Sequence, residues 1–151
     1  MALTAEDRTA IVDLINRHGH LVDAGEHDRM HELFTDDVTY DMTDLGGGTL
    51  TGLAALREAA LALGGANPVG HHVTNIVLGE PDGDEVRVRS KGIGINADGT
   101  CGSVTYEDTV RRGDRGWRIA YRRILARRSP LAGRVGQPEQ ARRAGPSGRD
   151  E

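Results

Sequence analysis

The sequence is poor in cysteine and aromatic residues and has no long apolar run. Its 151 residues include one cysteine, Cys101, so an internal disulfide is excluded and a reducing compartment is favoured. Aromatic residues make up only 3% of the chain. No apolar segment is long enough to cross a bilayer, and the first residues lack the features of a signal peptide. We therefore expect a cytoplasmic protein with no membrane partner.

The charge balance and the length favour one domain without a nucleic-acid partner. The formal net charge is −4 and the pI is about 5.9, which argues against a basic surface for nucleic acid. A chain of 151 residues can bury one sizeable core. From residue 129 onward the residues are mainly Gly, Pro, Arg, Gln and Glu. We therefore expect a folded domain over residues 1–128 and a disordered tail over 129–151.

Three helices are predicted in the first half of the chain. Thr4 is a suitable N-cap for a helix over residues 4–23, with Asp7 three residues later as in a capping box. Apolar residues recur on one face of this helix. A short second helix over 28–34 and a third, Ala- and Leu-rich helix over 54–63 follow.

The remaining regular segments are predicted strands, at residues 38–42, 70–78, 85–97, 100–112 and 116–127. The glycine-rich segment 44–49 is interpreted as a flexible loop. The last four strands follow one another directly, and turns such as Asp98-Gly99 predict an antiparallel meander. Helices followed by strands favour an α+β fold. We expect a curved antiparallel sheet with three N-terminal helices on one face, forming a cone-shaped α+β barrel whose mouth can hold a small ligand.

The strand Gly70–Leu78 carries the most informative residues. Its side chains alternate between two faces, so His71 and Asn75 share one face and His72 lies on the other. One imidazole should therefore point into the interior. A neutral buried His needs a partner for its ring N–H, and a His with such a partner can move protons near pH 7.

Several segments together resemble a known family. They are Ile11–Ile15 continuing to Asp23, Asp28–Val38, His71–Asn75, and Tyr106 to Ile119. Their order and spacing resemble the SnoaL-like branch of the nuclear transport factor 2-like superfamily over residues 4–127. The resemblance implies the α+β barrel fold. The superfamily includes polyketide cyclases, scytalone dehydratase, ketosteroid isomerases, limonene epoxide hydrolase and non-catalytic subunits, so the fold alone does not define an activity.

Within this superfamily the pattern looks most like scytalone dehydratase. That family pairs an Asp at the end of the first helix with a His that opens a central strand, and the matching residues here are Asp23 and His71. Asp23 would orient the imidazole and hold its tautomer, while the other ring nitrogen moves a proton. The contact would also give a donor to a carboxylate that the helix dipole disfavours. The alternative is an exposed Asp and an unrelated buried His.

The sequence departs from scytalone dehydratase at the residues that would hold its substrate. The two tyrosines of that family match Val22 and a position near Met42, although Tyr40 is close. A second His of the family matches Ser90, and an Asn matches Tyr106. The resemblance therefore implies a shared Asp–His pair acting on a molecule other than scytalone.

Further candidates for substrate contact come from the strands. Tyr40 and Tyr106 are either core aromatics or hydroxyl donors that position a substrate. Asp108 shares a strand face with Tyr106 and could supply a second carboxylate. Asn75 could bind a ligand carbonyl, or it could satisfy backbone groups of the sheet.

Other histidines and the arginines have less specific interpretations. His18 lies on the apolar side of the first helix and could reach the cavity, and His72 is the reserve candidate if the strand register shifts by one residue. His27 and His31 are four residues apart, as metal ligands on a helix can be, but no third ligand is evident and we predict no metal site. The arginines of the last strands are expected on a solvated face or an oligomer interface: Arg111, Arg112, Arg118, Arg122, Arg123, Arg127 and Arg128.

The predicted function is acid–base catalysis on a small apolar molecule without a cofactor. Dehydration, isomerisation or ring closure of a polyketide- or terpenoid-like compound in secondary metabolism fits the pair Asp23 and His71. One alternative is an epoxide-opening hydrolase or cyclase of the same fold. Another is a non-catalytic binding or assembly subunit resembling the small subunit of a ring-hydroxylating dioxygenase, which would have a blocked cavity. A homodimer or homotrimer is expected, because the outer face of such a sheet usually needs covering.

Overall fold

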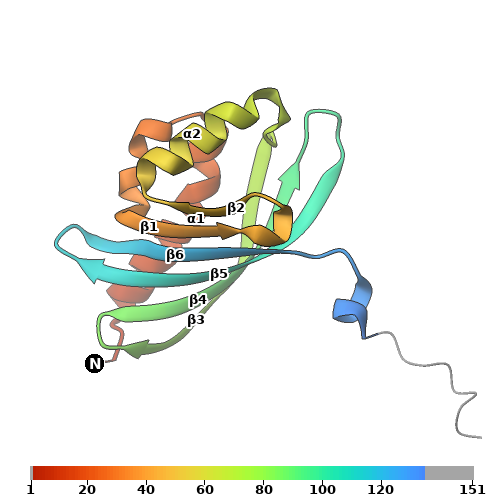
Figure 1. Cartoon of the computed structure of the whole chain (residues 1–151). Helices are drawn as coiled ribbons and strands as arrows, with labels where there is room; N and C mark the ends of the chain where they lie inside the picture. Colours follow the sequence, from red (N-terminus) through yellow and green to blue (C-terminus); the bar gives the residue numbers. More distant parts are fainter. Residues whose placement is uncertain (1, 135–151) are drawn as a thin grey trace, which may run out of the picture.

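The first helix begins where the sequence places its cap. The computed structural model describes residues 2–134, and its helix α1 spans Ala5–Asp23 (Figure 1). The Asp7 N–H donates to Thr4 Oγ1 at 3.0 Å, and the Thr4 N–H donates to the Asp7 carboxylate at 3.1 Å. This reciprocal pair is a full capping box, which satisfies two N–H groups at the helix start.

The other helices are shorter. The predicted second helix is a 3₁₀ helix, η1, at His27–Glu32, and Phe34 begins the next strand instead of ending that helix. Helix α2 spans Leu53–Leu63 and confirms the predicted third helix. Short 3₁₀ segments also occur in the connections: η2 at Thr43–Leu45, η3 at Gly64–Ala66 and η4 at Pro130–Gly133.

Six strands of the described chain form one sheet: β1 Phe34–Met42, β2 Gly48–Thr51, β3 Gly70–Asp82, β4 Glu85–Ile95, β5 Cys101–Gly113 and β6 Gly116–Ala126. Strand β2 begins inside the segment 44–49, so the prediction of a flexible loop is wrong for its last two residues. The strand exists because it pairs antiparallel with β1, with Tyr40 opposite Leu50.

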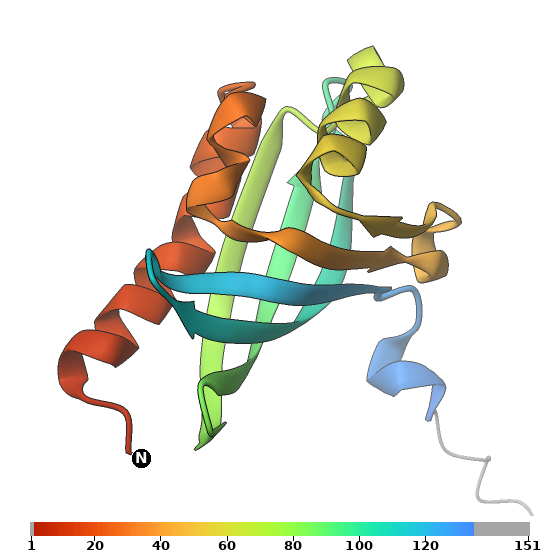
Figure 2. The ribbon, with the colours of Figure 1, turned by 60° about the vertical axis from the view of Figure 1, so that its left-hand side comes forward.

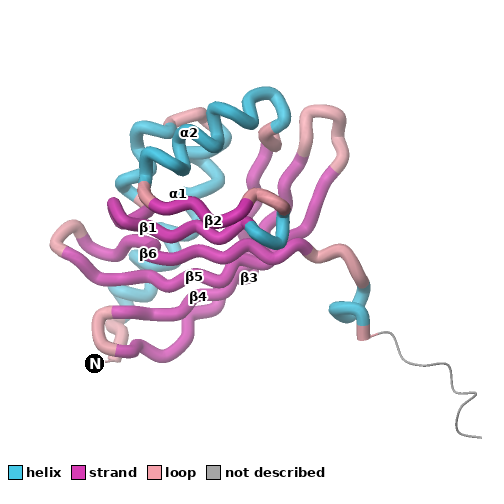
Figure 3. The backbone as a smooth tube through the Cα atoms, viewed as in Figure 1, coloured by secondary structure: helices cyan, strands magenta, loops and turns pink. Residues whose placement is uncertain are grey.

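The strand order β2-β1-β6-β5-β4-β3 makes one open sheet, whose strands are magenta in Figure 3. The meander of β3 to β6 is confirmed, and so is the α+β class. The sheet is not wholly antiparallel, however, because β1 and β6 run parallel. After β1 the chain forms β2 and then α2, which leads to β3 at the far edge of the sheet. The meander from β3 to β6 then brings β6 next to β1, and the two strands run in the same direction. The sheet also remains unclosed, since β2 and β3 are its two edges.

The helices lie on the curved sheet in two places, which Figure 2 shows from the side. Helix α1 runs beside β3 and also contacts β6. Helix α2 lies over β1 and β2 and contacts η1. The apolar face of α1 supplies Ile11, Leu14 and Ile15 to the core, where the strands contribute residues such as Val110 and Ile119. The space between the two helices is where the cavity described below is found.

Two of the register shifts in the sheet change the face on which predicted residues lie. In β3, Thr74 pairs with Lys91 and Val77 with Arg89, so two residues of β3 oppose Ser90 alone. In β6, Tyr121 pairs with Thr109 while Ile119 pairs with Val110, so Ala120 is an extra residue. A bulge reverses the alternation of faces beyond it.

The bulge in β6 places Arg122 in the core. Its side chain is 0% exposed, so the prediction that Arg122 belongs to a solvated face is wrong. Its guanidinium forms two hydrogen bonds with the equally buried carboxylate of Asp108, at 2.7 and 2.8 Å. A buried charge needs such a partner, because removing an ion from water is otherwise very costly.

Two further predictions concern membrane association and the C-terminal tail. None of the helices within residues 2–134 has the length and apolar character needed to span a membrane. The predicted tail begins with the turn η4 at Pro130–Gly133, and its larger part, residues 135–151, lies outside the described residues.

Candidate active site

A cavity of about 370 Å³ lies between the two helices and the inner face of the sheet. Its wall is mainly apolar and draws side chains from α1, α2 and most of the strands. The apolar lining includes Val22, Met30, Phe34, Met42, Leu50, Leu56, Leu63, Val104 and Ile124. A mainly apolar space with a few polar groups is typical of a site for a small organic molecule.

His71 lines this cavity and is in contact with Asp23. The ring nitrogen Nδ1 of His71 is 2.7 Å from Asp23 Oδ1. The backbone N–H of His71 also donates to the same carboxylate, at 3.1 Å to Oδ1 and 3.0 Å to Oδ2. Asp23 is the last residue of α1 and His71 is the second of β3, so the two element ends meet here.

The contact defines what the imidazole can do. A carboxylate accepts hydrogen bonds, so Nδ1 of His71 carries the proton that points to Asp23. In the neutral ring the other nitrogen, Nε2, then keeps a free lone pair. The side chains of His71 and Asp23 are 17% and 30% exposed, and His71 lines the cavity. The arrangement can therefore take up a proton from a molecule in the cavity and return it.

A glycine allows α1 and β3 to come this close. Gly19 is buried on α1, one helical turn before Asp23. A Cβ atom on Gly19 would lie closer than 3.0 Å to the carbonyl oxygen of His71, a separation that real Cβ atoms do not show. The absence of a side chain at Gly19 is thus a condition for the contact between Asp23 and His71.

His18 lines the same cavity. Its side chain is 5% exposed, and its ring centroid lies 6.1 Å from that of His71, with the two rings perpendicular. Burial lowers the pKa of His18 well below 6.5, and the charge of Arg122 and the neighbouring His71 act in the same direction. His18 is consequently neutral at pH 7.

Tyr40 and Tyr106 also line the cavity, and both are largely buried. Burial raises the pKa of Tyr40 to about 12 and raises that of Tyr106, although the charge of Arg122 opposes the shift in both. The guanidinium carbon of Arg122 lies 4.3 Å from the Tyr106 ring centroid, a cation–π distance. Both phenols therefore stay protonated at neutral pH and can donate hydrogen bonds.

Three predicted contact residues lie away from the cavity lining. Asn75 is exposed because the bulge in β3 turns it outward, so the prediction that it shares the face of His71 is wrong. Its backbone has φ of 56°, and its Oδ1 accepts the Thr74 hydroxyl at 2.5 Å. His72 is exposed on the outer face, and Asp108 is buried against Arg122.

The predictions about metal ligands can be compared with the described residues. His27 lines the cavity, while His31 Nδ1 lies 3.0 Å from the carbonyl oxygen of Asp28. Within residues 2–134 no group of three or more His, Cys, Asp or Glu side chains is arranged to hold a metal ion.

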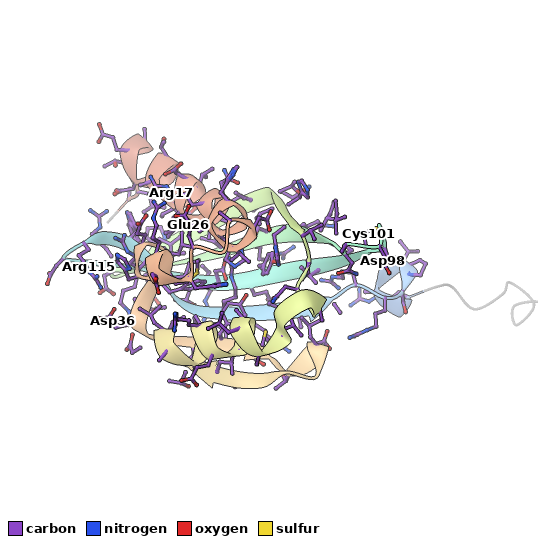
Figure 4. All side chains as sticks on the ribbon, turned by 90° about the horizontal axis from the view of Figure 1, so that it is seen from above. Arg17, Glu26, Asp36, Asp98, Cys101 and Arg115 are labelled. Atoms are coloured by element: carbon purple, nitrogen blue, oxygen red, sulfur yellow. The ribbon has the colours of Figure 1, made fainter. Side chains whose placement is uncertain are left out.

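A second, smaller cavity of about 200 Å³ lies at one end of the sheet, near the β5–β6 turn. Its rim includes Arg115 and Asp36, an exposed ion pair at 3.3 Å. Figure 4 shows this pair at the opposite end of the molecule from Asp98 and Cys101. Small-molecule sites are mainly apolar, whereas this second cavity is lined mainly by charged residues and glycines, so the larger apolar cavity remains the candidate site.

Two features of the site were missed in the sequence. The lining residues of α2 and Leu50 of β2 were not identified as such, because they face the cavity only once α2 lies over β1 and β2. Gly19 was also missed, although a glycine inside an otherwise regular helix, four residues before Asp23, is a usable signal.

Comparison with solved structures identifies the fold class as NTF2-like, also called cystatin-like. An NTF2-like protein with a cystatin-like fold from Novosphingobium aromaticivorans is 28% identical, with a TM-score of 0.69 over 85% of this chain and 87% of its own. A protein of unknown function from Mycobacterium tuberculosis is 29% identical, with a TM-score of 0.70 over 85% of this chain and 76% of its own. A type 2 hexachlorocyclohexane dehydrochlorinase shares the fold at 24% identity, with a TM-score of 0.67 over 87% and 93% of the two chains.

The family follows from the sequence match. The family of SnoaL-like domains matches residues 3–123, which is most of the chain. The comparison with curated proteins finds no match. The chain belongs to the SnoaL-like family, as the resemblance in the sequence implied.

Proposed function

We propose that this protein is a cofactor-independent acid–base enzyme in which His71 transfers protons and Asp23 orients it. The observation that carries the proposal is the 2.7 Å contact between Asp23 Oδ1 and His71 Nδ1 beside an apolar cavity of about 370 Å³. Membership of the SnoaL-like family and the shared fold of the dehydrochlorinase are consistent with small-molecule conversion.

The proposed chemistry is proton transfer at carbon. Asp23 holds the His71 proton on Nδ1, so Nε2 takes a proton from a C–H bond next to a carbonyl group. The electron pair of that bond forms an enolate and then expels a neighbouring hydroxyl as water when the imidazolium returns its proton. This sequence is a dehydration; returning the proton to another carbon gives an isomerisation. An apolar wall suits a polyketide- or terpenoid-like molecule and limits access of water.

The first test uses hydrogen exchange, because it requires no knowledge of the product. Small β-hydroxy ketones such as 3-hydroxycyclohexanone are incubated in D₂O, and NMR follows both exchange next to the carbonyl and loss of water. We expect His71→Gln to slow the wild-type reaction by about 10²- to 10⁴-fold, the usual contribution of general acid–base catalysis. Asp23→Asn should have a smaller effect, because the imidazole remains but its tautomer is no longer held.

His72→Gln is the matched control, because it changes the neighbouring imidazole on the exposed face of the same strand. Circular dichroism establishes that each variant is folded. Exchange in the His71→Gln variant at the wild-type rate would rule out the proposed role of His71.

The two alternatives are less well supported. A non-catalytic subunit was predicted to have a filled cavity, and the cavity here is open to a ligand of appreciable size. Epoxide opening with Asp108 as an acid is disfavoured, because its side chain is buried and bonded to Arg122. The expected homodimer or homotrimer and the cytoplasmic location stay predictions, which sedimentation and fractionation can check.

A further inference from the structure

The second imidazole of the cavity has no partner for one of its nitrogens. His18 Nδ1 is buried and forms no hydrogen bond within residues 2–134. Its ring instead meets three rings edge-on, those of Phe34, His71 and Tyr106, each at a centroid distance of 6.1 Å. Leaving a buried polar group unpaired is unfavourable, so proteins seldom keep one without a use.

The two side-chain amides of the lining are already engaged within the protein. The amide of Asn67 donates to the carbonyl oxygens of Ala60 and Gly64, both at 2.8 Å. The amide of Asn96 donates to the hydroxyl of Thr100 at 3.1 Å. Among the polar side chains of the lining, His18 combines deep burial with an unsatisfied ring.

The difference between the two imidazoles gives them different uses. Asp23 fixes the tautomer of His71, whereas nothing in residues 2–134 fixes the tautomer of His18. A neutral imidazole with a free tautomer can either donate to an oxygen atom or accept from a hydroxyl. It offers no positive charge to an anion, and the nearby guanidinium of Arg122 is already paired with Asp108.

We propose that His18 is the contact that holds an oxygen substituent of the substrate, so that substrates are uncharged molecules with a hydroxyl or carbonyl oxygen near the atom that reacts at His71, whose ring centroid lies 6.1 Å from that of His18. This inference rests on the proposed function of His71 and extends it to the substrate. Beside His18 a carboxylate would lose its hydration without gaining a free countercharge, because Arg57, which also lines the cavity, is already paired with Asp28 at 3.3 Å. We therefore expect the cavity to select against anionic molecules.

The test compares three probes of similar size: 2-naphthol, 2-methylnaphthalene and 2-naphthoate. Their dissociation constants are measured at pH 7 for the wild-type protein and for His18→Phe, which keeps the ring packing but removes both nitrogens. The relevant quantity is the ratio of the 2-methylnaphthalene constant to the 2-naphthol constant, since this ratio removes most of the apolar contribution. We expect His18→Phe to lower the ratio about three- to tenfold, the range for one net hydrogen bond.

The control is His20→Phe, which changes an exposed imidazole on the same helix and should leave the ratio unchanged. A second readout uses the wild-type protein alone: 2-naphthol should shift the ¹⁵N resonances of the His18 ring toward a single tautomer. An unchanged ratio in His18→Phe, or tight binding of 2-naphthoate by the wild-type protein, would overturn the inference.

The two proposals can fail separately. Binding of 2-naphthol requires no proton transfer at carbon, so the ratio is also measured in the His71→Gln background. A ratio that still depends on His18, together with unchanged exchange in His71→Gln, would refute only the catalytic role of His71. An unchanged ratio with slow exchange in His71→Gln would refute only the role of His18.

Discussion

Gly19→Ala tests whether the close approach of α1 and β3 positions Asp23 and His71, the proposed catalytic pair. The added methyl group would meet the carbonyl oxygen of His71 at less than 3.0 Å, so helix and strand must move apart by several tenths of an ångström. The contact between Asp23 and His71 is 2.7 Å long, and such a movement would stretch or break it. The hydrogen bonds from the His71 backbone N–H to the Asp23 carboxylate are already 3.0 and 3.1 Å long, so a smaller movement would break them.

Gly19→Ala should lower the stability of the protein only modestly and its activity strongly. Alanine is favoured over glycine inside a helix by up to about 1 kcal/mol. Forcing an extra methyl group into a packed site costs about 1–3 kcal/mol. The net loss in the free energy of unfolding should therefore stay below about 2 kcal/mol. A displacement of the reacting groups by a fraction of an ångström to 1 Å can reduce the rate by up to about 10²-fold.

The assay combines urea unfolding with the hydrogen-exchange reaction of the β-hydroxy ketone. We expect Gly19→Ala to lower kcat much more than it raises KM, and to weaken the NMR signal of the His71 Nδ1–H proton. Gly65→Ala is the matched control, because a Cβ at Gly65 meets open space. A Gly19→Ala protein with the wild-type rate and an unchanged Nδ1–H signal would refute the reasoning.

Three further predictions concern stability. Asp108→Asn removes the countercharge of the buried Arg122 and should cost about 3 kcal/mol or more in urea unfolding, whereas Asp108→Leu combined with Arg122→Met should cost clearly less; equal losses would contradict this. The Thr4 N–H, the Trp117 indole and a nearby arginine lower the pKa of Asp7 to about 2, below the ordinary 3.8. The folded state therefore binds this proton less readily than the unfolded state, and stability is lost as the pH falls from about 4 to about 2. Asp7→Asn should show a weaker decline in Tm over this range. Burial lowers the pKa of His18 below 6.5, so below that pH the unfolded chain binds a proton that the folded chain excludes. The free energy of unfolding should therefore fall by up to about 1.4 kcal/mol for each pH unit below 6.5. His18→Phe should lack this contribution when unfolding is measured over a series of pH values.

Much of the fold could be predicted from local sequence. The capping residues Thr4 and Asp7 and the apolar face of the first helix define α1 without reference to any other element. Alternation of residues and the turn at Asp98-Gly99 define the meander. The position of Asp23 at a helix end, with the resemblance to a known family, was enough to predict its partner His71, which the structure places at hydrogen-bond distance.

What could not be predicted depends on pairing between strands. An extra residue such as Ala120 is invisible in the sequence of β6, because it becomes a bulge only against the register of β5. That single insertion reverses the faces beyond it and buries Arg122. The same effect in β3 turns Asn75 outward. Strand β2 is four residues long and depends on β1 for its hydrogen bonds, so its own glycine-rich sequence gave no sign of it.

Helix α2 has no fully buried residue, although Leu56 and Leu63 line the cavity. The helix therefore covers an interior that the chain itself leaves unfilled. A molecule of the right shape would fill the cavity and pack against α2. Ligand binding is then linked to folding. At a concentration of 100 times its Kd, such a molecule adds about 2.7 kcal/mol to the free energy of unfolding. The melting temperature of the protein should accordingly identify its natural ligand before any reaction is known.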